Sequence, residues 1–385
     1  MSNELKNPKI ARKTNIIFSI PSAVVGGIEN HLSRQLRLFS SDEYEISVIL
    51  LFAKSKITLK DILPSHVTVY DFAFKNIYDI PNVKKLYRLL KKLKPHVVVT
   101  SAFDANTLFR VLAPFVGYIC VPRLHNLYLT QPLHLRFVDF VIAHFSSTIV
   151  AVSKGVADYA SKRTWIPRKK FTVIPNGIDL DETQAYAKEH PDTKKLRQER
   201  GFGLDAKIIL VVGRLKPQKN IGLAIDAFAH FVQNTNDTKH VLVIVGDGGD
   251  LEMLKERAVT YGLSERVIFT GLKRDTFGYY HIADMFLMTS IREGFPNVLL
   301  ESMACGVPFI STRVPGATEA IQDGYNGFLA DSSTEDLAEK IAIIAGSSQE
   351  EKARYRASCL ATAQKYSMEV NVRRYKELFS RLLKK

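Results

Sequence analysis

The sequence of 385 residues contains little cysteine and no long hydrophobic run. Its three cysteines, Cys120, Cys305 and Cys359, are far apart and form no CxxC pair. This spacing argues against a disulfide framework or a zinc site and favours a reducing compartment, so we expect a cytoplasmic protein. No window reaches the ~18 uncharged apolar residues that are needed to cross a bilayer. The closest, FVDFVIAHF, is short and is interrupted by Asp139 and His144.

Signals for secretion, repetition and nucleic-acid binding are also absent. The start, MSNELKNPKIARKTN, is polar and mixed in charge, so we expect no signal peptide. The sequence shows no repeat with a period of about 20–50 residues and no low-complexity segment. It contains no GxGxxG fingerprint and no helix-turn-helix or RNA-binding signature, which weakens a dinucleotide or nucleic-acid hypothesis.

Acidic residues are scarce overall, but the shortage is uneven, and the net charge is +14. Residues 1–180 hold 25 Lys and Arg against 12 Asp and Glu, whereas residues 181–350 hold 18 against 24. The tail from 351 to 385 is basic again, with 10 against 3. A phosphate-bearing ligand, an anionic membrane surface or a nucleic acid would each suit the basic parts, and composition does not choose among them.

What the sequence does contain is a regular alternation of β-rich runs and amphipathic helical runs. In the first half we predict strands at 15–20, 44–51, 66–72 and 96–100 and helices at 28–39 and 83–94. Such alternation predicts an α/β fold in which helices cover a parallel sheet.

The alternation restarts in the second half of the chain. A strand-like stretch at 171–180 ends in a Pro-Asn-Gly turn, and polar sequence follows to about Asp205. New strand and helix runs begin at KIILVVG, and residues 349–385 are predicted to form two helices. Two open α/β sheets in one chain suggest a ligand between them, because such sheets bind ligands at the carboxyl ends of their strands.

Two motifs after predicted strands suit a phosphate. In VVGGIEN, Gly27 opens a helix whose free N–H groups favour an anion, although a tight turn uses glycine anyway. VVGRLKPQKN presents Arg214 and Lys219, where a guanidinium fork and an ammonium suit a diphosphate. The alternative is a solvated basic loop. The acidic VIVGDGGD is interpreted as a structural loop. GLKRD is either a turn or a segment whose backbone groups contact a nucleobase.

The strongest local signal is REGFPNVLLESMACGVP. Pro296 suits the first turn of a helix that starts near Phe295 to Asn297, and the free N–H groups of that turn form an anion or hydroxyl site. Glu293 stays in the loop, and Glu301 lies about one turn further into the helix. As a pair of carboxylates, the two glutamates are also compatible with the acid–base pair of a glycoside hydrolase.

Two further features have two interpretations each. His125 follows the strand GYICVP and in a cleft could donate to a phosphate or a sugar hydroxyl, but a lone histidine is more often structural. The basic helix at 83–94 resembles a membrane-surface helix, and covering a sheet is the favoured interpretation.

In their order along the chain, GGIEN, PNGID, GRL-x3-K, VGDG, GLKRD and E-x7-E followed by ACGVP resemble the retaining glycosyltransferases of family 4. The resemblance covers nearly the whole chain. It implies the GT-B fold, in which two Rossmann-like α/β domains face each other across a cleft. The implied domains are 1–178 and 179–365, with 366–385 forming a helix that crosses back to the N-terminal domain.

The resemblance also implies roles for single residues. Arg214 and Lys219 would bind the donor diphosphate, Glu301 the ribose and Leu272 the region of the base. Gly27 would approach the donor from the N-terminal domain. The donor sugar would be held by Glu293, Gly294, Phe295, Pro296 and Asn297. The candidate catalytic residues are Glu293, His125, Arg214 and Lys219.

The implied activity is transfer of a hexose or N-acetylhexosamine, with retention, from a nucleoside-diphosphate sugar, UDP being favoured over GDP. The acceptor would be a glycan or a polyprenyl-diphosphate-linked saccharide in surface polysaccharide assembly. No metal and no other cofactor is expected, and no nucleic-acid partner. The basic N-terminal half would contact the acceptor or the inner face of the plasma membrane. Alternatives are a nucleotide-sugar epimerase or a phosphorylase on the same architecture and a basic nucleic-acid-binding protein.

Overall fold

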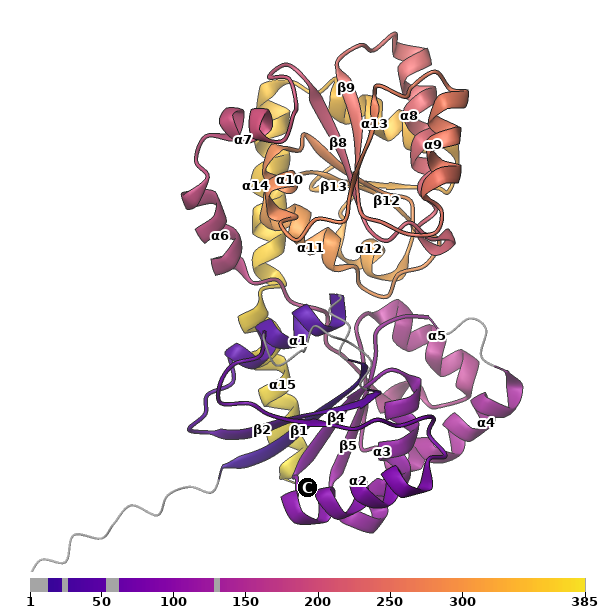
Figure 1. Cartoon of the computed structure of the whole chain (residues 1–385), viewed down its shortest axis with the longest axis vertical. Coiled ribbons are helices and arrows are strands. Elements are labelled where there is room, and N and C mark those ends of the chain that lie inside the picture. Colours follow the sequence, from indigo (N-terminus) through magenta and orange to yellow (C-terminus); the bar gives the residue numbers. More distant parts are fainter. Residues whose placement is uncertain (1–12, 23–26, 53–61, 128–131, 385) are drawn as a thin grey trace, which may run out of the picture.

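The computed structural model describes residues 13–22, 27–52, 62–127 and 132–384. These residues form two α/β domains stacked end to end, the N-terminal one in indigo and magenta and the C-terminal one in red and orange (Figure 1). Every strand pairing within the two sheets is parallel. The predicted pair of parallel α/β domains is therefore confirmed.

The N-terminal sheet has seven strands in the order β3-β2-β1-β4-β5-β6-β7. Its strands are β1 (Thr14–Ser22), β2 (Tyr44–Phe52), β3 (Thr68–Asp71), β4 (Val97–Ser101), β5 (Ile119–Leu124), β6 (Ile149–Ala151) and β7 (Phe171–Val173). The helices between them are α1 (Gly27–Arg37), α2 (Ile80–Leu93), α3 (Phe103–Val116), α4 (Leu133–Ile142) and α5 (Lys154–Thr164). The strand order reverses between β1 and β4, which places a crevice at the carboxyl ends of these two strands.

Local sequence explains why these elements form. All five residues of β4 are buried, as expected for a continuous apolar run inside a parallel sheet covered on both faces. Helix α2 is amphipathic, and its Leu86 and Leu90 are fully buried in the cluster beneath the sheet. The basic helix therefore covers the sheet. Asp79 caps its first turn by accepting a hydrogen bond from the Asn82 N–H.

The C-terminal sheet has six strands in the order β10-β9-β8-β11-β12-β13. Its strands are β8 (Lys207–Val212), β9 (His240–Val245), β10 (Val267–Gly271), β11 (Met285–Met288), β12 (Phe309–Thr312) and β13 (Gly327–Ala330). The helices are α8 (Ile221–Thr235), α9 (Leu251–Thr260), α10 (Phe277–Ile282), α11 (Asn297–Ala304), α12 (Pro315–Ala320), α13 (Thr334–Ala345) and α14 (Gln349–Lys365). Here the order reverses between β8 and β11.

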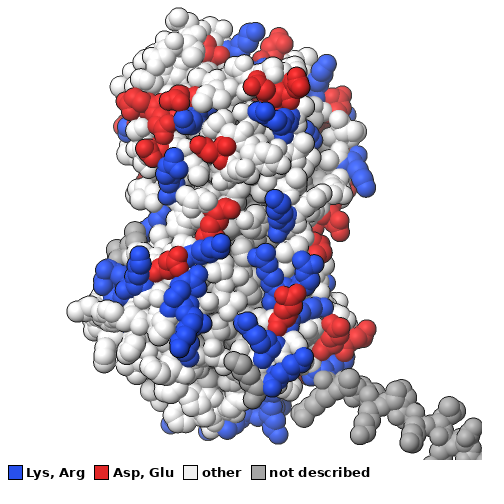
Figure 2. All heavy atoms as spheres, turned by 180° about the vertical axis from the view of Figure 1, so that it is seen from behind, with Lys and Arg blue, Asp and Glu red and all other residues white. Residues whose placement is uncertain are grey.

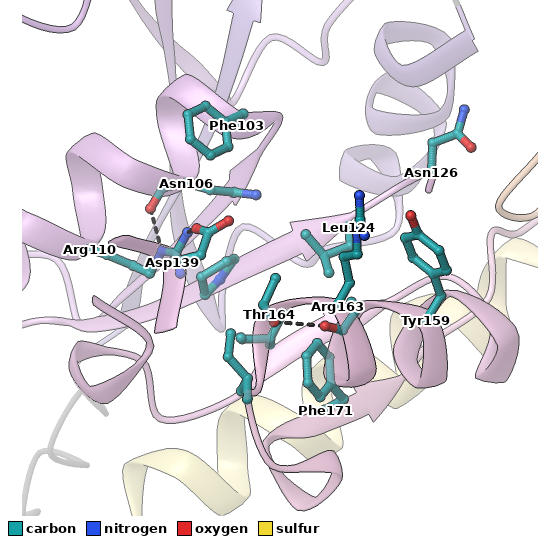
Figure 3. Close-up of a pocket in the computed structure, with 14 residues that line it drawn as sticks. Phe103, Asn106, Arg110, Leu124, Asn126, Asp139, Tyr159, Arg163, Thr164 and Phe171 are labelled. Carbon is teal, nitrogen blue, oxygen red and sulfur yellow. Dashed lines mark hydrogen bonds and ion pairs between the residues drawn. The ribbon is translucent and has the colours of Figure 1, made fainter. Parts of the chain in front are cut away.

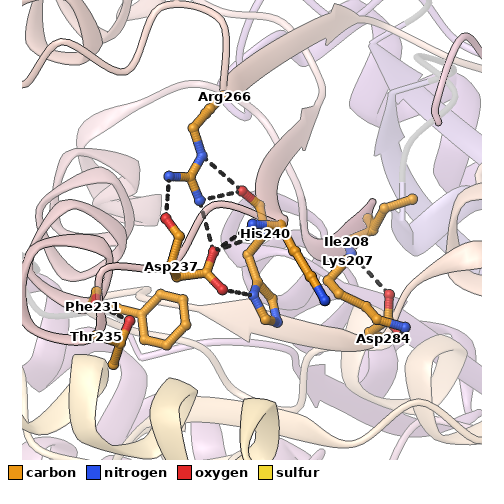
Figure 4. Close-up of polar contacts among 9 residues, drawn as sticks. Lys207, Ile208, Phe231, Thr235, Asp237, His240, Arg266 and Asp284 are labelled. Atoms are coloured by element: carbon orange, nitrogen blue, oxygen red, sulfur yellow. Dashed lines mark hydrogen bonds and ion pairs between the residues drawn. The ribbon is translucent and has the colours of Figure 1, made fainter. Parts of the chain in front are cut away.

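The amino-terminal edge of this second sheet is held by a polar network around Asp237 (Figure 4). The Asp237 carboxylate accepts hydrogen bonds from the His240 N–H at 2.8 Å and from Arg266 Nη2 at 2.8 Å. Burial opposes ionisation of Asp237, but the hydrogen bonds from His240 prevail and its pKa is lowered. The network links the first residues of β9 and β10. The carboxyl ends of the strands lie at the opposite edge of the sheet, toward the other domain.

The chain passes between the domains twice. Helices α6 (Leu180–Glu189) and α7 (Thr193–Glu199) lead into the C-terminal domain and pack against α10. Helix α15 (Met368–Leu383) then returns, and its apolar side buries Val372, Tyr375 and Phe379 in the core of the N-terminal domain. In Figure 1 the yellow helix runs beneath the indigo strands.

The domains also touch directly beside the cleft. Glu319 of α12 accepts a hydrogen bond from the Gly155 N–H at the start of α5, at 3.0 Å. One apolar cluster includes Val152 and Val156 of the N-terminal domain and Val314 of the C-terminal domain. Such apolar contact resists free rotation of one domain against the other.

Charge is divided between the domains as the sequence predicts. On the face shown in Figure 2, Lys and Arg predominate over the N-terminal domain, and most Asp and Glu lie over the C-terminal domain. Among the helices that the structure describes, none combines the length and the apolar content required to traverse a bilayer.

Candidate functional site

A cleft of about 380 Å³ lies between the two domains, at the carboxyl ends of both sheets. The N-terminal domain contributes His31, His125, Asn126 and Asn176 to its wall. The C-terminal domain contributes Arg214, Lys219, Glu293, Phe295, Pro296 and Asn297. Six residues that the sequence analysis singled out on separate motifs are therefore brought to one C-terminal wall, and His125 faces them from the other domain.

The loop after β8 carries the two candidate cations of the cleft. Its path requires a close approach between backbones, since a Cβ on Gly246 would lie 1.9 Å from the Gly213 carbonyl oxygen. Gly246 also has a φ of +148°, which favours glycine. Lys219 ends a short 3₁₀ turn and its carbonyl accepts a hydrogen bond from the Thr289 hydroxyl at 3.1 Å. The backbone that presents Arg214 and Lys219 is thus anchored to both neighbouring strands.

Lys219 and Glu293 form an ion pair inside the cleft. Lys219 Nζ lies 2.8 Å from Glu293 Oε1, and both side chains are mostly buried. The contact is close enough for a strong Coulomb attraction, although its angles are not those of a well-aligned hydrogen bond. Gln218 fixes the glutamate loop by donating from Nε2 to the Arg292 carbonyl oxygen at 2.9 Å. A cation and an anion are therefore held together where the two loops meet.

The amino terminus of α11 opens into the same cleft. The helix begins at Asn297, within the predicted range, and Pro296 occupies the N-cap position, one residue before the first turn in which it was expected. Asn176, from the loop after β7, donates from Nδ2 to the Phe295 carbonyl at 2.8 Å and to Asn297 Oδ1 at 2.9 Å. One side chain of the N-terminal domain thus positions the turn whose N–H groups favour an anion.

Gly294 lies against the backbone of the other domain. A Cβ at this position would lie 2.1 Å from the His125 carbonyl oxygen and 2.9 Å from Val152 Cγ2. No side chain fits there without moving the domains apart. The glycine between Glu293 and Phe295 is therefore required by the contact of the two domains at the cleft.

Two histidines in the wall are kept neutral. Burial, together with the nearby charge of Arg123, holds the pKa of both His31 and His125 well below the ordinary histidine value. His31 Nε2 accepts a hydrogen bond from the Gly177 N–H at 2.9 Å, so this nitrogen is unprotonated. His125 Nε2 lies 3.1 Å from the Ser101 hydroxyl. The imidazole of His125 can therefore offer a neutral donor or acceptor to a ligand.

The guanidinium of Arg123 is a buried cation behind this wall. Arg123 is the penultimate residue of β5, close to the cleft, and is only 2% exposed. Its Nη2 donates to Asn176 Oδ1 at 3.1 Å, and no described carboxylate forms an ion pair with it. Its charge explains part of the low pKa of the neighbouring histidines and orients the Asn176 side chain.

Glu301 lies apart from the other candidates. It sits one turn into α11 and does not line the cleft, and its Oε2 accepts a hydrogen bond from the buried Tyr280 hydroxyl at 2.9 Å. Burial raises the pKa of Glu301, and the nearby positive charge of Arg34 opposes this shift. Since Glu293 and Glu301 do not share one wall, the geometry does not support the acid–base pair of a hydrolase.

Leu272 lines a smaller pocket of about 190 Å³ that continues from the cleft past Gly213 and Arg214. Its side chain is 80% exposed. Gly27 is the first residue of α1, and residues 23–26, which include Gly26 of the VVGGIEN motif, lie outside the described residues. The roles predicted for Leu272, Gly27 and Glu301 stay predictions.

A second, apolar pocket of about 40 Å³ lies behind the cleft in the N-terminal domain (Figure 3). It is lined by Phe103, Leu124, Tyr159 and Phe171 among others, and Asn126 lines both this pocket and the cleft. In the parts of the chain that the structure describes, no group of three His, Cys, Asp or Glu side chains is placed to hold a metal ion.

Sequence reasoning missed several residues of the site. Asn176 belongs to the PNGID motif, but nothing in the local sequence shows that its side chain reaches the other domain. His31 lies in α1, four residues after Gly27, and Arg123 lies inside a strand. Helical spacing after a glycine pair was a usable signal for His31, whereas Arg123 offered none.

Comparison with known proteins gives two consecutive family matches. Residues 25–182 match the model of Glycosyltransferase Family 4, and residues 192–362 match that of Glycosyl transferases group 1. The chain is 26% identical over 319 residues to the UDP-Gal:alpha-D-GlcNAc-diphosphoundecaprenol alpha-1,3-galactosyltransferase of Escherichia coli, covering 80% of this chain and 81% of that protein. It is 28% identical to the N-acetyl-alpha-D-glucosaminyl L-malate synthase of Bacillus anthracis, covering 80% of each.

A solved structure shares the arrangement of the two domains. The crystal structure of Anabaena Alr3699/HepE in complex with UDP superposes with a TM-score of 0.83 at 23% identity, covering 95% of this chain and 99% of that one. At this level of identity the likeness establishes the fold, and the predicted GT-B architecture is confirmed.

Proposed function

Because the chain belongs to the family 4 glycosyltransferases, with a group 1 C-terminal domain, we propose that it transfers a hexose or N-acetylhexosamine from a nucleoside-diphosphate sugar. The proposed acceptor is a hydroxyl of a glycan or of a polyprenyl-diphosphate-linked saccharide. The proposed setting is the assembly of a surface polysaccharide of the O-antigen or capsule type, at the inner face of the plasma membrane.

One observation carries the proposal. Arg214, Lys219 and the amino terminus of α11 meet Glu293 on a single wall of the cleft, at the carboxyl ends of the C-terminal sheet. A diphosphate needs positive charge and N–H groups, and a sugar needs a carboxylate and backbone acceptors for its hydroxyls. A nucleotide sugar therefore matches this wall as one ligand.

UDP is the proposed nucleotide. The name of the Escherichia coli relative, which aligns with 80% of the chain, gives UDP-Gal as its donor. The Anabaena structure of the same fold is a complex with UDP. The pocket beside Leu272 continues from Arg214, which is where a base joined to a diphosphate on Arg214 and Lys219 would extend. We propose that Glu301, further along α11, binds the ribose.

We propose a lipid-linked acceptor on the N-terminal domain. The Escherichia coli relative is named for a diphosphoundecaprenol-linked acceptor, and the N-terminal half of this chain is strongly basic. Basic residues suit the diphosphate of such an acceptor. His125 and Asn126 would lie beside the incoming hydroxyl, on the wall that faces the donor.

The proposed chemistry is retention by front-face substitution. The bond from the anomeric carbon to the diphosphate breaks while the acceptor oxygen attacks from the same face, and the leaving phosphate takes the proton of the acceptor hydroxyl. Arg214, Lys219 and the α11 amino terminus would neutralise the developing charge, so we propose that no metal takes part. Closure of the domains over the cleft would exclude water.

A donor panel tests the proposal. The purified protein is titrated with UDP and GDP by calorimetry and assayed with UDP-glucose, UDP-galactose, their N-acetyl forms and GDP-mannose, using a GlcNAc-diphosphate-polyprenol acceptor. We expect UDP binding and transfer from one UDP-sugar, unchanged by EDTA, with the product in the same anomeric configuration by NMR. A protein that neither binds UDP or GDP nor hydrolyses any donor would refute the transferase proposal.

A further inference from the structure

Helix α4 of the N-terminal domain carries its apolar residues on the outside. Leu133, Phe137 and Val141 follow one another at intervals of four residues, Phe145 in the next turn continues the row, and Val138 lies beside it. These five side chains, here called the α4 stripe, are 38 to 63% exposed. A helix rises about 1.5 Å per residue, so the stripe is roughly 18 Å long.

The one acidic residue of α4 points inward. Asp139 is buried and accepts a hydrogen bond from Arg110 Nη2 of α3 at 2.6 Å, and the two side chains lie together at one side of the apolar pocket in Figure 3. A helix that only covered a core would have the opposite arrangement, with its acid outside and Phe137 inside. The sequence of α4 is therefore arranged for an apolar partner outside the domain.

Cations border the stripe. The 3₁₀ turn Arg168–Lys170, here called the basic turn, reaches the end of the stripe, because Lys170 Nζ donates to the Ser146 carbonyl next to Phe145 at 2.8 Å. Trp165, the only tryptophan of the chain, lies just before the basic turn and is 52% exposed. Tryptophan is enriched where an apolar phase meets water.

Figure 1 places helix α4, which carries the stripe, at the margin of the molecule, on the outer edge of the N-terminal domain. After the half-turn of Figure 2, this edge is at the lower left, where the surface is uncharged and Lys and Arg side chains border it. An exposed apolar ridge with a cationic border fits a bilayer that contains anionic lipids. A second copy of the chain presenting the same face would bring like charges together.

We propose that the α4 stripe and the basic turn dock the N-terminal domain on an anionic phospholipid bilayer. The stripe enters the headgroup and acyl boundary, and the basic turn with Trp165 contacts the headgroups. Asn126 of the cleft wall also lines the apolar pocket that Asp139 of α4 borders, so docking through α4 would hold the acceptor wall of the cleft near the membrane surface. This last step, presentation of a lipid-linked acceptor, rests on the proposed function, whereas docking itself does not.

Vesicle sedimentation of the full chain tests the docking. The protein is mixed with vesicles of phosphatidylglycerol and phosphatidylethanolamine in equal parts, or of phosphatidylcholine alone, without donor or acceptor. The variant is Leu133→Ser/Phe137→Ser. The matched control is Met253→Ser/Val259→Ser, which removes two exposed apolar side chains from α9 of the other domain. If the double variant shows no thermal unfolding transition, the single variant Phe137→Ser is used in its place.

We expect the wild type to bind the anionic vesicles, with salt weakening the binding, and the emission of Trp165 to shift to shorter wavelength. The α4 variant should bind about tenfold or more weakly, while the α9 control stays within about twofold. Nucleotide binding by each variant is measured separately. A chain that binds vesicles but no nucleotide would keep the docking and refute the proposed transferase.

Four results would overturn the docking. The first is a wild-type protein that does not bind anionic vesicles, and the second is an α4 variant that binds them as tightly as the wild type does. The third is an unchanged Trp165 emission in protein that sediments with the vesicles, because the contact with the membrane would then lie elsewhere. The fourth is a wild-type dimer in light scattering that the α4 variant converts to a monomer, since the stripe would then join two copies of the chain.

Discussion

The ammonium group of Lys219 lies 2.8 Å from the carboxylate of Glu293, and the two residues come from loops that follow β8 and β11. The strands β8 and β11 are hydrogen-bonded neighbours at the point where the strand order of the C-terminal sheet reverses. The ion pair therefore stands where a doubly wound sheet receives its ligand. It also means that a ligand phosphate on Lys219 and a ligand hydroxyl on Glu293 would lie side by side.

This pairing predicts different defects for its two members. Lys219→Met should weaken UDP binding about tenfold to a hundredfold, because one charge-assisted contact to phosphate is worth roughly 1.5–3 kcal/mol. Glu293→Gln should leave UDP binding within about threefold and lower the transfer rate by about a hundredfold, as expected for a contact made to the transferred sugar. Calorimetry with UDP and a transfer assay separate the two effects.

The control for this pair is Glu252→Gln, which breaks the exposed Lys255–Glu252 ion pair on α9 and should change neither quantity. A Glu293→Gln protein that lost UDP affinity while turning over normally would contradict the assigned division between phosphate and sugar.

Glu301 is predicted to act on the nucleotide. Glu301→Gln should weaken UDP binding about tenfold, since a charged acceptor for a ribose hydroxyl is lost. Tyr280→Phe removes the hydroxyl that orients this carboxylate at 2.9 Å and should weaken UDP binding by a smaller factor. Tyr118→Phe is the matched control, because it also removes a buried hydroxyl donor, to the Phe109 carbonyl at 2.7 Å, away from the cleft. If both tyrosine variants bind UDP equally well, Tyr280 has no part in orienting Glu301.

Gly294→Ala should separate the domains at the cleft. The added methyl group would lie 2.1 Å from the His125 carbonyl oxygen, which is backbone and yields only if the loops move apart. We expect a loss of about 1–3 kcal/mol in the free energy of unfolding and at least a tenfold loss of transfer activity. Gly249→Ala is the control, as a Cβ there meets nothing within 4 Å. Similar activity in the two variants would mean that the His125 contact is not required for transfer.

Stability should fall below neutral pH because of the buried histidines. The pKa of His31 is held well below its ordinary value of 6.5 by burial and by Arg123. Below about pH 6.5, His31 therefore binds a proton in the unfolded chain but stays neutral in the folded chain. As the pH falls through 6.5, each such histidine lowers the free energy of unfolding by up to about 1.4 kcal/mol per pH unit, until its folded pKa is reached.

Thermal unfolding between pH 5 and pH 8 measures this slope. His31→Gln keeps an oxygen that can accept from the Gly177 N–H and has no titrating ring, so its slope below pH 6.5 should be shallower than that of the wild type. Equal slopes in the two proteins would show that His31 binds protons alike in the folded and unfolded states.

Asn371 should be a stabilising link between α15 and the N-terminal domain. Its side chain is 3% exposed, donates to the Pro175 carbonyl at 2.6 Å and accepts from Gln35 Nε2 at 2.8 Å. Asn371→Ala leaves both partners buried without it and should cost about 2–4 kcal/mol in urea unfolding. Arg373→Ala, on the exposed side of the same helix, should cost less than about 0.5 kcal/mol. Equal losses in the two variants would mean that the two hydrogen bonds of Asn371 do not stabilise the fold, because alanine has the higher helix propensity at both positions.

Much of this architecture could be predicted from the sequence, because local periodicity distinguishes strands from helices and shows that an element has an apolar face. The alternation of apolar strands and amphipathic helices indicated two parallel α/β domains, and Pro296 marked the start of α11. Arg214, Lys219 and Glu293 follow strands of one sheet, so they had to end at the same edge. The sequence by itself thus determined the fold class and the wall of the cleft that belongs to the C-terminal domain.

The tertiary structure alone decided which of these residues meet. The ion pair of Lys219 with Glu293 and the hydrogen bonds of Asn176 to the turn before α11 join segments whose separation carries no local signal. The spacing of Glu301 from Glu293 in the sequence is compatible with a position inside or outside the cleft. Only the tertiary structure shows that Glu301 lies outside the cleft wall and accepts a hydrogen bond from Tyr280. Likewise, the apolar spacing of α4 suits an inner or an outer face. Its stripe faces solvent because Asp139 pairs with Arg110 inside, and a periodicity specifies two faces of a helix without specifying which of them the rest of the chain will cover.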